Sequence, residues 1–175
     1  MRRIAALITL VAIALLLVAC GADRGTRRDL TLGVHHVSIR LPEGWQVLDF
    51  GREVRVSGDG LAFTLGDLGP LGSEGLESPD APALAAAALE RIEPAARRDV
   101  AARRLRPVAG RPTVVFDTWD RLTHEHRRRV AFVLHDGHAL VLNTKEGGFA
   151  AAGPRFEAML DSLRFETPAG AIAGS

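Results

Sequence analysis

Two apolar segments joined by a tight turn constrain the fold of this chain more than any other feature. Val130 to Leu134 and Ala139 to Leu142 are apolar at every position, and Asp136-Gly137 between them is a strong hairpin signal. An antiparallel strand with one face in water alternates apolar and polar side chains instead. Since these strands do not alternate, we expect their part of the sheet to be covered on both faces.

Further strands are predicted on both sides of this hairpin in the sequence. Val37 to Leu41 alternates apolar and polar residues, which predicts a strand with one buried face. Gly58-Asp59-Gly60 predicts a second hairpin turn. Residues 66–79, rich in glycine, predict a loop, and we expect one long strand from Thr123 to Leu134.

Two helices are also predicted. Pro79 and Pro82 around Asp80 predict the N-terminus of a helix over Ala83 to Ile92, because the first turn tolerates proline. Pro154 opens a second helix, whose apolar residues Phe156, Met159, Leu160 and Leu163 lie at the spacing of one buried face. Between these helices, residues 95–107 are compatible with helix or strand, and the return to Val108 favours a strand from Val100.

The N-terminus predicts export and lipidation. Basic residues at 2 and 3 precede an apolar run, Ile4 to Ala19, in which Thr9 is the only polar side chain. The run ends in Leu17-Val18-Ala19-Cys20, which resembles the lipobox that precedes a diacylglyceryl cysteine. An uncleaved anchor fits less well, because sixteen residues are short against the roughly 20 that span a bilayer. We therefore expect residues 1–19 to be a signal peptide and acyl chains such as palmitate to hold Cys20 at the extracytoplasmic or periplasmic membrane face.

The remaining chain has the length of one domain. Residues 20–31 are polar and lack an apolar period, so we expect a lipidated N-terminus and tether there, followed by one globular domain over 32–166. A disordered tail is expected over 167–175. Because Cys20 is the only cysteine, the predicted domain has no disulfide, no cysteine nucleophile and no cysteine-bound metal.

Charge is concentrated in the middle of the chain. Residues 91–129 carry 11 basic and 5 acidic residues, although the full chain has a net charge of +1. Arg127, Arg128 and Arg129 are therefore candidate residues for binding an anion or an anionic lipid headgroup. The competing interpretation is an ordinary charged surface, because the arginine excess is typical of a GC-rich genome and acidic residues such as Glu93 and Asp117 lie in the same segment.

The histidines suggest metal ligands only in pairs. His124 and His126 would share one face of a strand, and His135 and His138 bracket the predicted turn. Nine residues of strand between His126 and His135 would span roughly 30 Å, so the four cannot form one site. Each pair supplies too few ligands, and a third from His35 or His36 would depend on the fold. We predict no metal site and no cofactor.

The sequence also lacks the common catalytic motifs. It contains no Gly-x-Ser-x-Gly, no P-loop, no Gly-x-Gly-x-x-Gly and no His-Glu-x-x-His. No aromatic ladder accompanies the arginines, which argues against nucleic acid as a partner. We therefore expect a protein that is not an enzyme and has no catalytic residue.

Three segments together resemble a known superfamily: Val37 to Trp45, Val108 to Pro112, and Phe156 to Phe165. In this order and spacing they resemble the PsbP-like (Mog-type) superfamily, which includes bacterial envelope lipoproteins of the DcrB and LpqN type. The resemblance implies an α+β fold, an antiparallel sheet flanked by helices on both faces in an α/β/α sandwich. It supplies no catalytic residues, and the function of such domains is binding or assembly.

These observations lead to one expected function and two alternatives. We expect a membrane-anchored envelope lipoprotein whose non-catalytic domain binds an envelope protein or a small ligand. The first alternative is an anion- or lipid-binding carrier that uses the basic segment 91–129, and the second is a hydrolase of unknown substrate.

Overall fold

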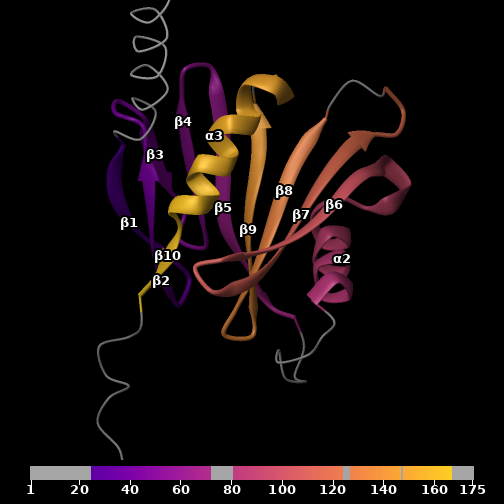
Figure 1. Ribbon diagram of the computed structural model, residues 1–175, viewed down its shortest axis with the longest axis horizontal. Coiled ribbons are helices and arrows are strands. Elements are labelled where there is room, and N and C mark those ends of the chain that lie inside the picture. The colour runs from indigo at the N-terminus through magenta and orange to yellow at the C-terminus, as the bar shows by residue number, and fades with distance from the viewer. Residues whose placement is uncertain (1–24, 72–80, 124–126, 147, 167–175) are drawn as a thin grey trace, which may run out of the picture.

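The computed structural model describes residues 25–71, 81–123, 127–146 and 148–166, which form two antiparallel sheets and two α-helices (Figure 1). One sheet has the strand order β1-β2-β10, and the other has the order β3-β4-β5-β9-β8-β7-β6. The elements are β1 Thr26–Leu32, β2 His35–Leu41, β3 Gln46–Asp49, β4 Glu53–Gly58, β5 Leu61–Pro70, α2 Ala81–Ile92, the 3-10 turn η2 Ala95–Arg97, β6 Arg98–Val108, β7 Arg111–Asp120, β8 Arg128–His135, β9 His138–Glu146, α3 Phe149–Ser162 and β10 Arg164–Phe165.

The hairpin predicted at Asp136-Gly137 joins β8 to β9 near the middle of the larger sheet. Asp136 has φ 46° and Gly137 has φ 82°, and positive φ at both central residues is the signature of a type I′ turn. This turn pairs His135 with His138 across the strand ends. The predicted hairpin is therefore confirmed, and it brings two histidines side by side.

The side chains of this hairpin are buried on both faces of the sheet, as its apolar sequence predicts. Ala131 and Val133 of β8 belong to a core cluster that contains Phe156 and Leu160 of α3. The intervening residues Val130, Phe132 and Leu134 belong to a second cluster, with Ala85, Ala88 and Leu89 of α2. Successive side chains of a strand point to opposite faces. Each parity of β8 therefore has its own apolar partners.

The two helices start earlier than predicted. Helix α2 begins at Ala81 and α3 at Phe149, with Pro154 inside α3 instead of at its start. The backbone N–H of Ala152 already donates to the carbonyl of Gly148 at 2.9 Å, and the alanines before Pro154 have high helix propensity. The predicted apolar face of α3 is confirmed, because Phe156, Met159, Leu160 and Leu163 are all buried.

Strand β1 corrects the predicted tether over 20–31 and the domain start at Leu32. β1 runs from Thr26, and its register with β2 extends from Thr26 opposite Leu41 to Leu32 opposite His35. Only Leu30 and Leu32 of β1 are buried. Most of its side chains face solvent at a sheet edge, so the sequence carries no apolar alternation to reveal the strand.

Three further segments can be compared with their predicted bounds. Strand β5 extends to Pro70, into the predicted loop over 66–79. The segment 95–107 is a 3-10 turn followed by strand from Arg98, which confirms the strand favoured there. Strand β8 begins at Arg128 and not at Thr123 as predicted. Thr123 lies in a turn, in which Asp120 accepts the backbone N–H groups of Leu122 and Thr123.

The predicted signal peptide over 1–19, Cys20 and the predicted tail over 167–175 lie outside the described residues. No helix in the described part of the chain is long and apolar enough to cross a membrane.

Candidate functional site

The arginine run predicted as an anion-binding face is paired with carboxylates. Arg129 donates from Nε and Nη2 to the two oxygens of Asp117, at 2.7 and 3.0 Å, and from Nη1 to Glu157 at 2.9 Å. Asp117 is opposite Arg129 in the register of β7 and β8. The hydrogen bonds to Asp117, with the charge of Glu157, raise the pKa of Arg129 despite its burial. This guanidinium is a structural cation.

The neighbouring arginines are engaged in the same way. Arg127 lies 3.3 Å from Asp117, and its guanidinium packs over the rings of Trp119 and Phe149, at 5.1 and 4.0 Å from their centroids. Arg128 is more exposed and lies 3.9 Å from Glu93. We call Arg127, Arg129, Asp117 and Glu157 the arginine cluster.

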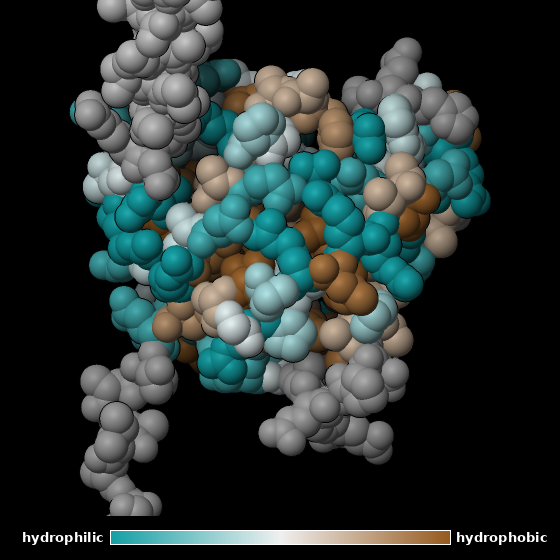
Figure 2. Space-filling model, in the orientation of Figure 1, coloured by the Kyte–Doolittle hydropathy of each residue, from teal (hydrophilic) through white to brown (hydrophobic). Residues whose placement is uncertain are grey.

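The arginine cluster continues onto the surface between β6 and α3. Arg104 and Arg106 of β6 both bond to Glu157, at 3.1 and 3.0 Å, and Arg106 also pairs with Asp161. Figure 2 shows hydrophilic side chains crossing the middle of the face on which Figure 1 places α3 and part of β6. Positive charge on this face is thus interleaved with negative charge, which leaves little net attraction for an anion.

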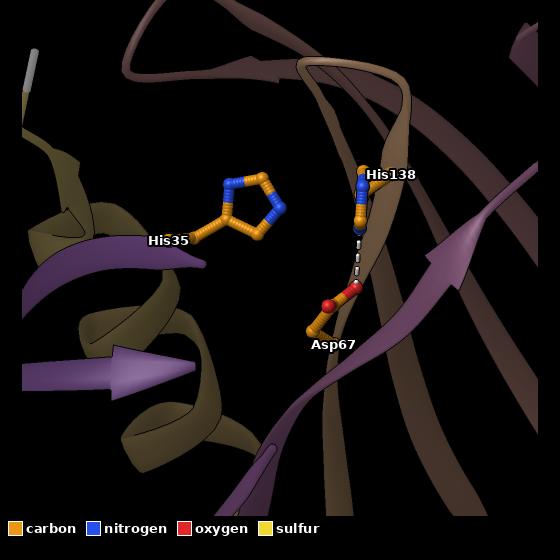
Figure 3. A group of neighbouring side chains, drawn as sticks. All are labelled: His35, Asp67 and His138. Atoms are coloured by element: carbon orange, nitrogen blue, oxygen red, sulfur yellow. Dashed lines mark hydrogen bonds and ion pairs between the residues drawn. The ribbon is translucent and has the colours of Figure 1, made fainter. Parts of the chain in front are cut away.

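A second polar group lies where the two sheets meet. His35 is the first residue of β2, Asp67 is in β5, and His135 and His138 end β8 and begin β9. Figure 3 shows His35 and His138 side by side from different strands, with Asp67 bonded to His138. We call these four residues the histidine cluster.

The carboxylate of Asp67 is held in place by three hydrogen bonds. Its Oδ1 accepts hydrogen bonds from Nδ1 of His138 at 2.9 Å and from the Gly69 N–H at 2.7 Å, and its Oδ2 accepts from Arg52 at 3.0 Å. The side chain of Asp67 is only 1% exposed. Burial raises the pKa of Asp67, but the hydrogen bonds from His138, Gly69 and Arg52 outweigh it and the net shift is downward. Asp67 is therefore an ionised, buried carboxylate.

The bond to Asp67 fixes the proton on His138. An ionised carboxylate can only accept a hydrogen bond, so Nδ1 of His138 carries a proton and, in the neutral ring, Nε2 has the free lone pair.

The turn between β1 and β2 closes over the carboxylate, since a Cβ added to Gly33, at φ +63°, would lie 3.0 Å from Oδ2 of Asp67.

His35 and His135 are buried, and each has a ring nitrogen that lacks a hydrogen-bond partner among the described residues. Nε2 of His35 has none, and Nδ1 of His135 lies 3.3 Å from Asp136 without the geometry of a hydrogen bond. The ring of His35 lies 4.6 Å from that of His138 and 5.3 Å from that of His135, between centroids. The ring of Phe165 covers the other side of His135 at 4.3 Å.

Burial is the main cause that lowers the pKa of both His35 and His135. His138 lowers the pKa of His35 further, against opposing effects of Asp67 and Asp136, and at His135 the largest opposing effect is that of Asp136. Arg111 contributes to the lowering at His135. Both rings are thus neutral at pH 7 and carry a lone pair on one nitrogen.

The structure brings together only part of what the sequence suggested. His135 and His138 bracket a turn as predicted, and His35 joins them through the contact between the two sheets. His124 and His126 lie outside the described residues. Sequence reasoning missed Asp67, which it placed in a loop; the signal available was the run from Leu61 to Leu65, which continues into β5.

Two further features of the structure are a core tryptophan and a hollow in the surface. Trp45 is a core residue: it stacks on Phe63 with 5.8 Å between ring centroids, and its indole N–H donates to Asp59 at 3.2 Å. A hollow of about 490 Å³, open to solvent, lies beside β4 and β5, lined by Phe50, Glu53, Arg55, Thr64 and Lys145. It includes none of the three candidate arginines.

Comparison with known proteins identifies the fold. No protein-family model and no curated protein matches this sequence. Among solved structures, the chain is similar to cyanobacterial PsbP (CyanoP) from Synechocystis sp. PCC 6803, with a TM-score of 0.59 and 10% identity over 83% of this chain and 96% of that one. A protein of unknown function from Pseudomonas aeruginosa matches with a TM-score of 0.49 and 13% identity, over 82% of this chain and 99% of the other. The fold is PsbP-like.

Proposed function

We propose that the protein is a lipid-anchored accessory of the cell envelope, whose PsbP-like domain works by binding and not by catalysis. The observation that carries the proposal is the likeness to CyanoP, which extends over 83% of this chain. At 10% identity the likeness concerns the fold alone, and the accessory role in this proposal is what the resemblance to the PsbP-like superfamily implies. The predicted lipobox, Leu17 to Cys20, supplies the anchor and the extracytoplasmic location in this proposal.

The proposal includes a specific architecture, an α/β/α sandwich in which helices flank both faces of the larger sheet. Alternate residues of β8 support it: Ala131 and Val133 belong to the apolar cluster of α3, and Phe132 between them belongs to the cluster of α2. A sheet covered in this way buries its middle strands. Recognition would then use the strand ends, sheet edges and loops, where polar groups are accessible.

The anchor is tested by the variant Cys20→Ala, expressed in its native host with an alkyne-labelled fatty acid. We expect the wild-type protein to be labelled and to fractionate with membranes, and the variant to lose the label, because the thiol is the only one in the chain. Asp23→Asn, three residues further on, is the matched control and should be labelled like the wild type. Label retained by Cys20→Ala would refute the lipoprotein proposal.

The binding role is tested by crosslinking in intact cells followed by identification of the captured proteins. We expect specific envelope partners with the wild-type protein and fewer with Cys20→Ala, since loss of the anchor removes the domain from the membrane surface. Turnover of ester, phosphate or glycoside substrates by purified protein would contradict the non-catalytic role and favour the hydrolase alternative.

A further inference from the structure

The histidine cluster has the composition of a transition-metal site. One ligand atom each from His35, Asp67 and His138 lies within 4.8 Å of the others, and the same holds for His35, His135 and Asp136. His35 belongs to both groups. These ligands come from β2, β5, β8 and β9, so they are assembled only when the two sheets are in contact.

The donor atoms select the kind of ion. Two or three imidazole nitrogens with one carboxylate suit Zn²⁺ and related divalent transition metals, whereas Ca²⁺ and Mg²⁺ require shells of oxygen. Zinc binds these ligands at about 2.0–2.2 Å. Atoms within 4.8 Å of one another can reach a common ion through small rotations of the side chains.

An unsatisfied nitrogen is the independent observation that points to a ligand. Nε2 of His35 is buried and has no hydrogen-bond partner in the described part of the chain, and His35 as a whole is 6% exposed. Leaving a buried polar atom without a partner costs free energy, so such atoms are rare in native folds. A metal ion bound at this lone pair would remove that cost.

Charge and orientation favour the same conclusion. Asp67 supplies a buried negative charge, and its second oxygen is held by Arg52, whose own side chain is 62% exposed. The hydrogen bond between Nδ1 of His138 and Asp67 already holds these two groups 2.9 Å apart, so an ion that replaces the bridging proton would meet both as ligands. Preorganised ligands lose little conformational freedom on binding.

We propose that His35, His138 and Asp67 bind one divalent transition-metal ion of the zinc type, which displaces to solvent the Nδ1 proton that His138 donates to Asp67 in the metal-free protein. This deepens the proposed function by naming a ligand class for the binding domain. It rests on the binding part of that function and not on the lipid anchor.

The test is zinc binding by the full-length protein in detergent, after removal of metal with a chelator. Zn²⁺ is titrated in competition with a chromophoric chelator, and Co²⁺ is added separately because its visible absorption reports coordination by nitrogen and oxygen. We expect one zinc per chain and a Co²⁺ spectrum that zinc abolishes.

Matched variants locate the ion. His35→Gln and His138→Gln should each weaken zinc binding by about tenfold or more, as removal of a ligand or of its support does. His36→Gln is the control, because His36 is the neighbouring residue on β2 but is exposed on the opposite parity. It should bind zinc like the wild type. The side chain of His138 is 22% exposed, so its replacement disturbs packing less than that of His35.

Two results would overturn the proposal: a wild-type protein that binds no stoichiometric zinc, or equal zinc affinity in the wild type, His138→Gln and His36→Gln. Circular dichroism of each variant shows whether it has folded, and His138→Gln and Asp67→Asn keep the test valid if His35→Gln has not. Failure of the fatty-acid labelling would leave these zinc results unchanged, so the two proposals fail independently.

Discussion

The arginine cluster and the histidine cluster are both partly buried polar groups, and they differ in the kind of atom that is left without a hydrogen-bond partner in the described part of the chain. Arg129 meets Asp117 through two hydrogen bonds and Glu157 through a third, so its charge is matched within the fold. In the histidine cluster Asp67 is matched, but Nε2 of His35 is not. In the arginine cluster the buried atom without a partner is Nε–H of Arg127, a donor that cannot bind a metal ion, whereas an imidazole nitrogen such as Nε2 of His35 can offer a lone pair to one.

The largest effect is expected from removing Asp117. Asp117→Ala leaves the guanidinium of Arg129, whose side chain is 14% exposed, without its main partner, and should lower the free energy of unfolding by about 3 kcal/mol. Urea unfolding followed by circular dichroism measures this loss. The control is Asp99→Ala, which breaks an exposed pair with Arg121 and should cost no more than about 1 kcal/mol. Equal losses in both variants would show that the arginine cluster is not a structural centre.

The second effect concerns zinc and stability. If the histidine cluster binds zinc only when folded, zinc at 100 times its dissociation constant should stabilise the protein by about 2.7 kcal/mol. Urea unfolding of chelated and zinc-loaded protein gives the difference. At the same zinc concentration it should fall to about 1.4 kcal/mol or less in His35→Gln, which binds zinc about tenfold more weakly or worse, and persist in His36→Gln. Full zinc stabilisation in His35→Gln would place the ion elsewhere.

A third, smaller effect is the pH dependence of the metal-free protein. The pKa values of His35 and His135 are lowered from 6.5 in the folded state, mainly by burial, so the unfolded chain binds protons first as the pH falls. The free energy of unfolding should therefore be highest above pH 6.5 and decline as the pH drops below it. Among the charged groups that face these rings, His138 and Arg111 lower the pKa values further, and Asp67 and Asp136 oppose the lowering; Arg52 pairs with Asp67.

Unfolding curves of chelated protein between about pH 7.5 and pH 5.5 measure this decline. His35→Asn should reduce its slope, and the exposed neighbour variant His36→Asn should not. A slope that is the same in His35→Asn and in the wild type would mean that His35 does not titrate differently in the two states.

The smallest effect is expected at Arg128, which tests the carrier alternative. Arg128 is 44% exposed and lies 3.9 Å from Glu93, so it is the most accessible of the three candidate arginines. We expect Arg128→Gln to leave the ratio of binding to anionic and neutral vesicles unchanged, because nearby carboxylates already neutralise this face. An electrostatic carrier would instead lose about 1 kcal/mol of binding to anionic vesicles, about fivefold. Co-sedimentation with vesicles measures this ratio. A lipid anchor strengthens binding to anionic and to neutral vesicles equally, so it does not change the ratio.

The sequence predicted the middle strands of the larger sheet, because the turn and the apolar pattern that mark them are local in sequence. The turn at Asp136-Gly137 and the apolar residues on both parities of β8 and β9 were enough to predict a hairpin with two buried faces. The same reasoning missed β1, because an edge strand that buries only Leu30 and Leu32 has no periodic apolar pattern. It also ended β5 too early, and with it lost Asp67.

For the sites, the sequence by itself determined which residues were adjacent, and the tertiary structure decided which of them are functional candidates. Three consecutive arginines were conspicuous in the sequence, yet carboxylates from β7 and α3 neutralise two of them. His135 and His138 were visible as a pair across a turn, because a hairpin is a local structure.

His35 and Asp67 joined that pair only through the contact between the two sheets, across sequence separations that no local pattern reports. Proximity in sequence fixes contacts within a turn or a hairpin. Contacts between separate sheets are fixed by burial of the shared core, and that burial has placed His35 beside His138.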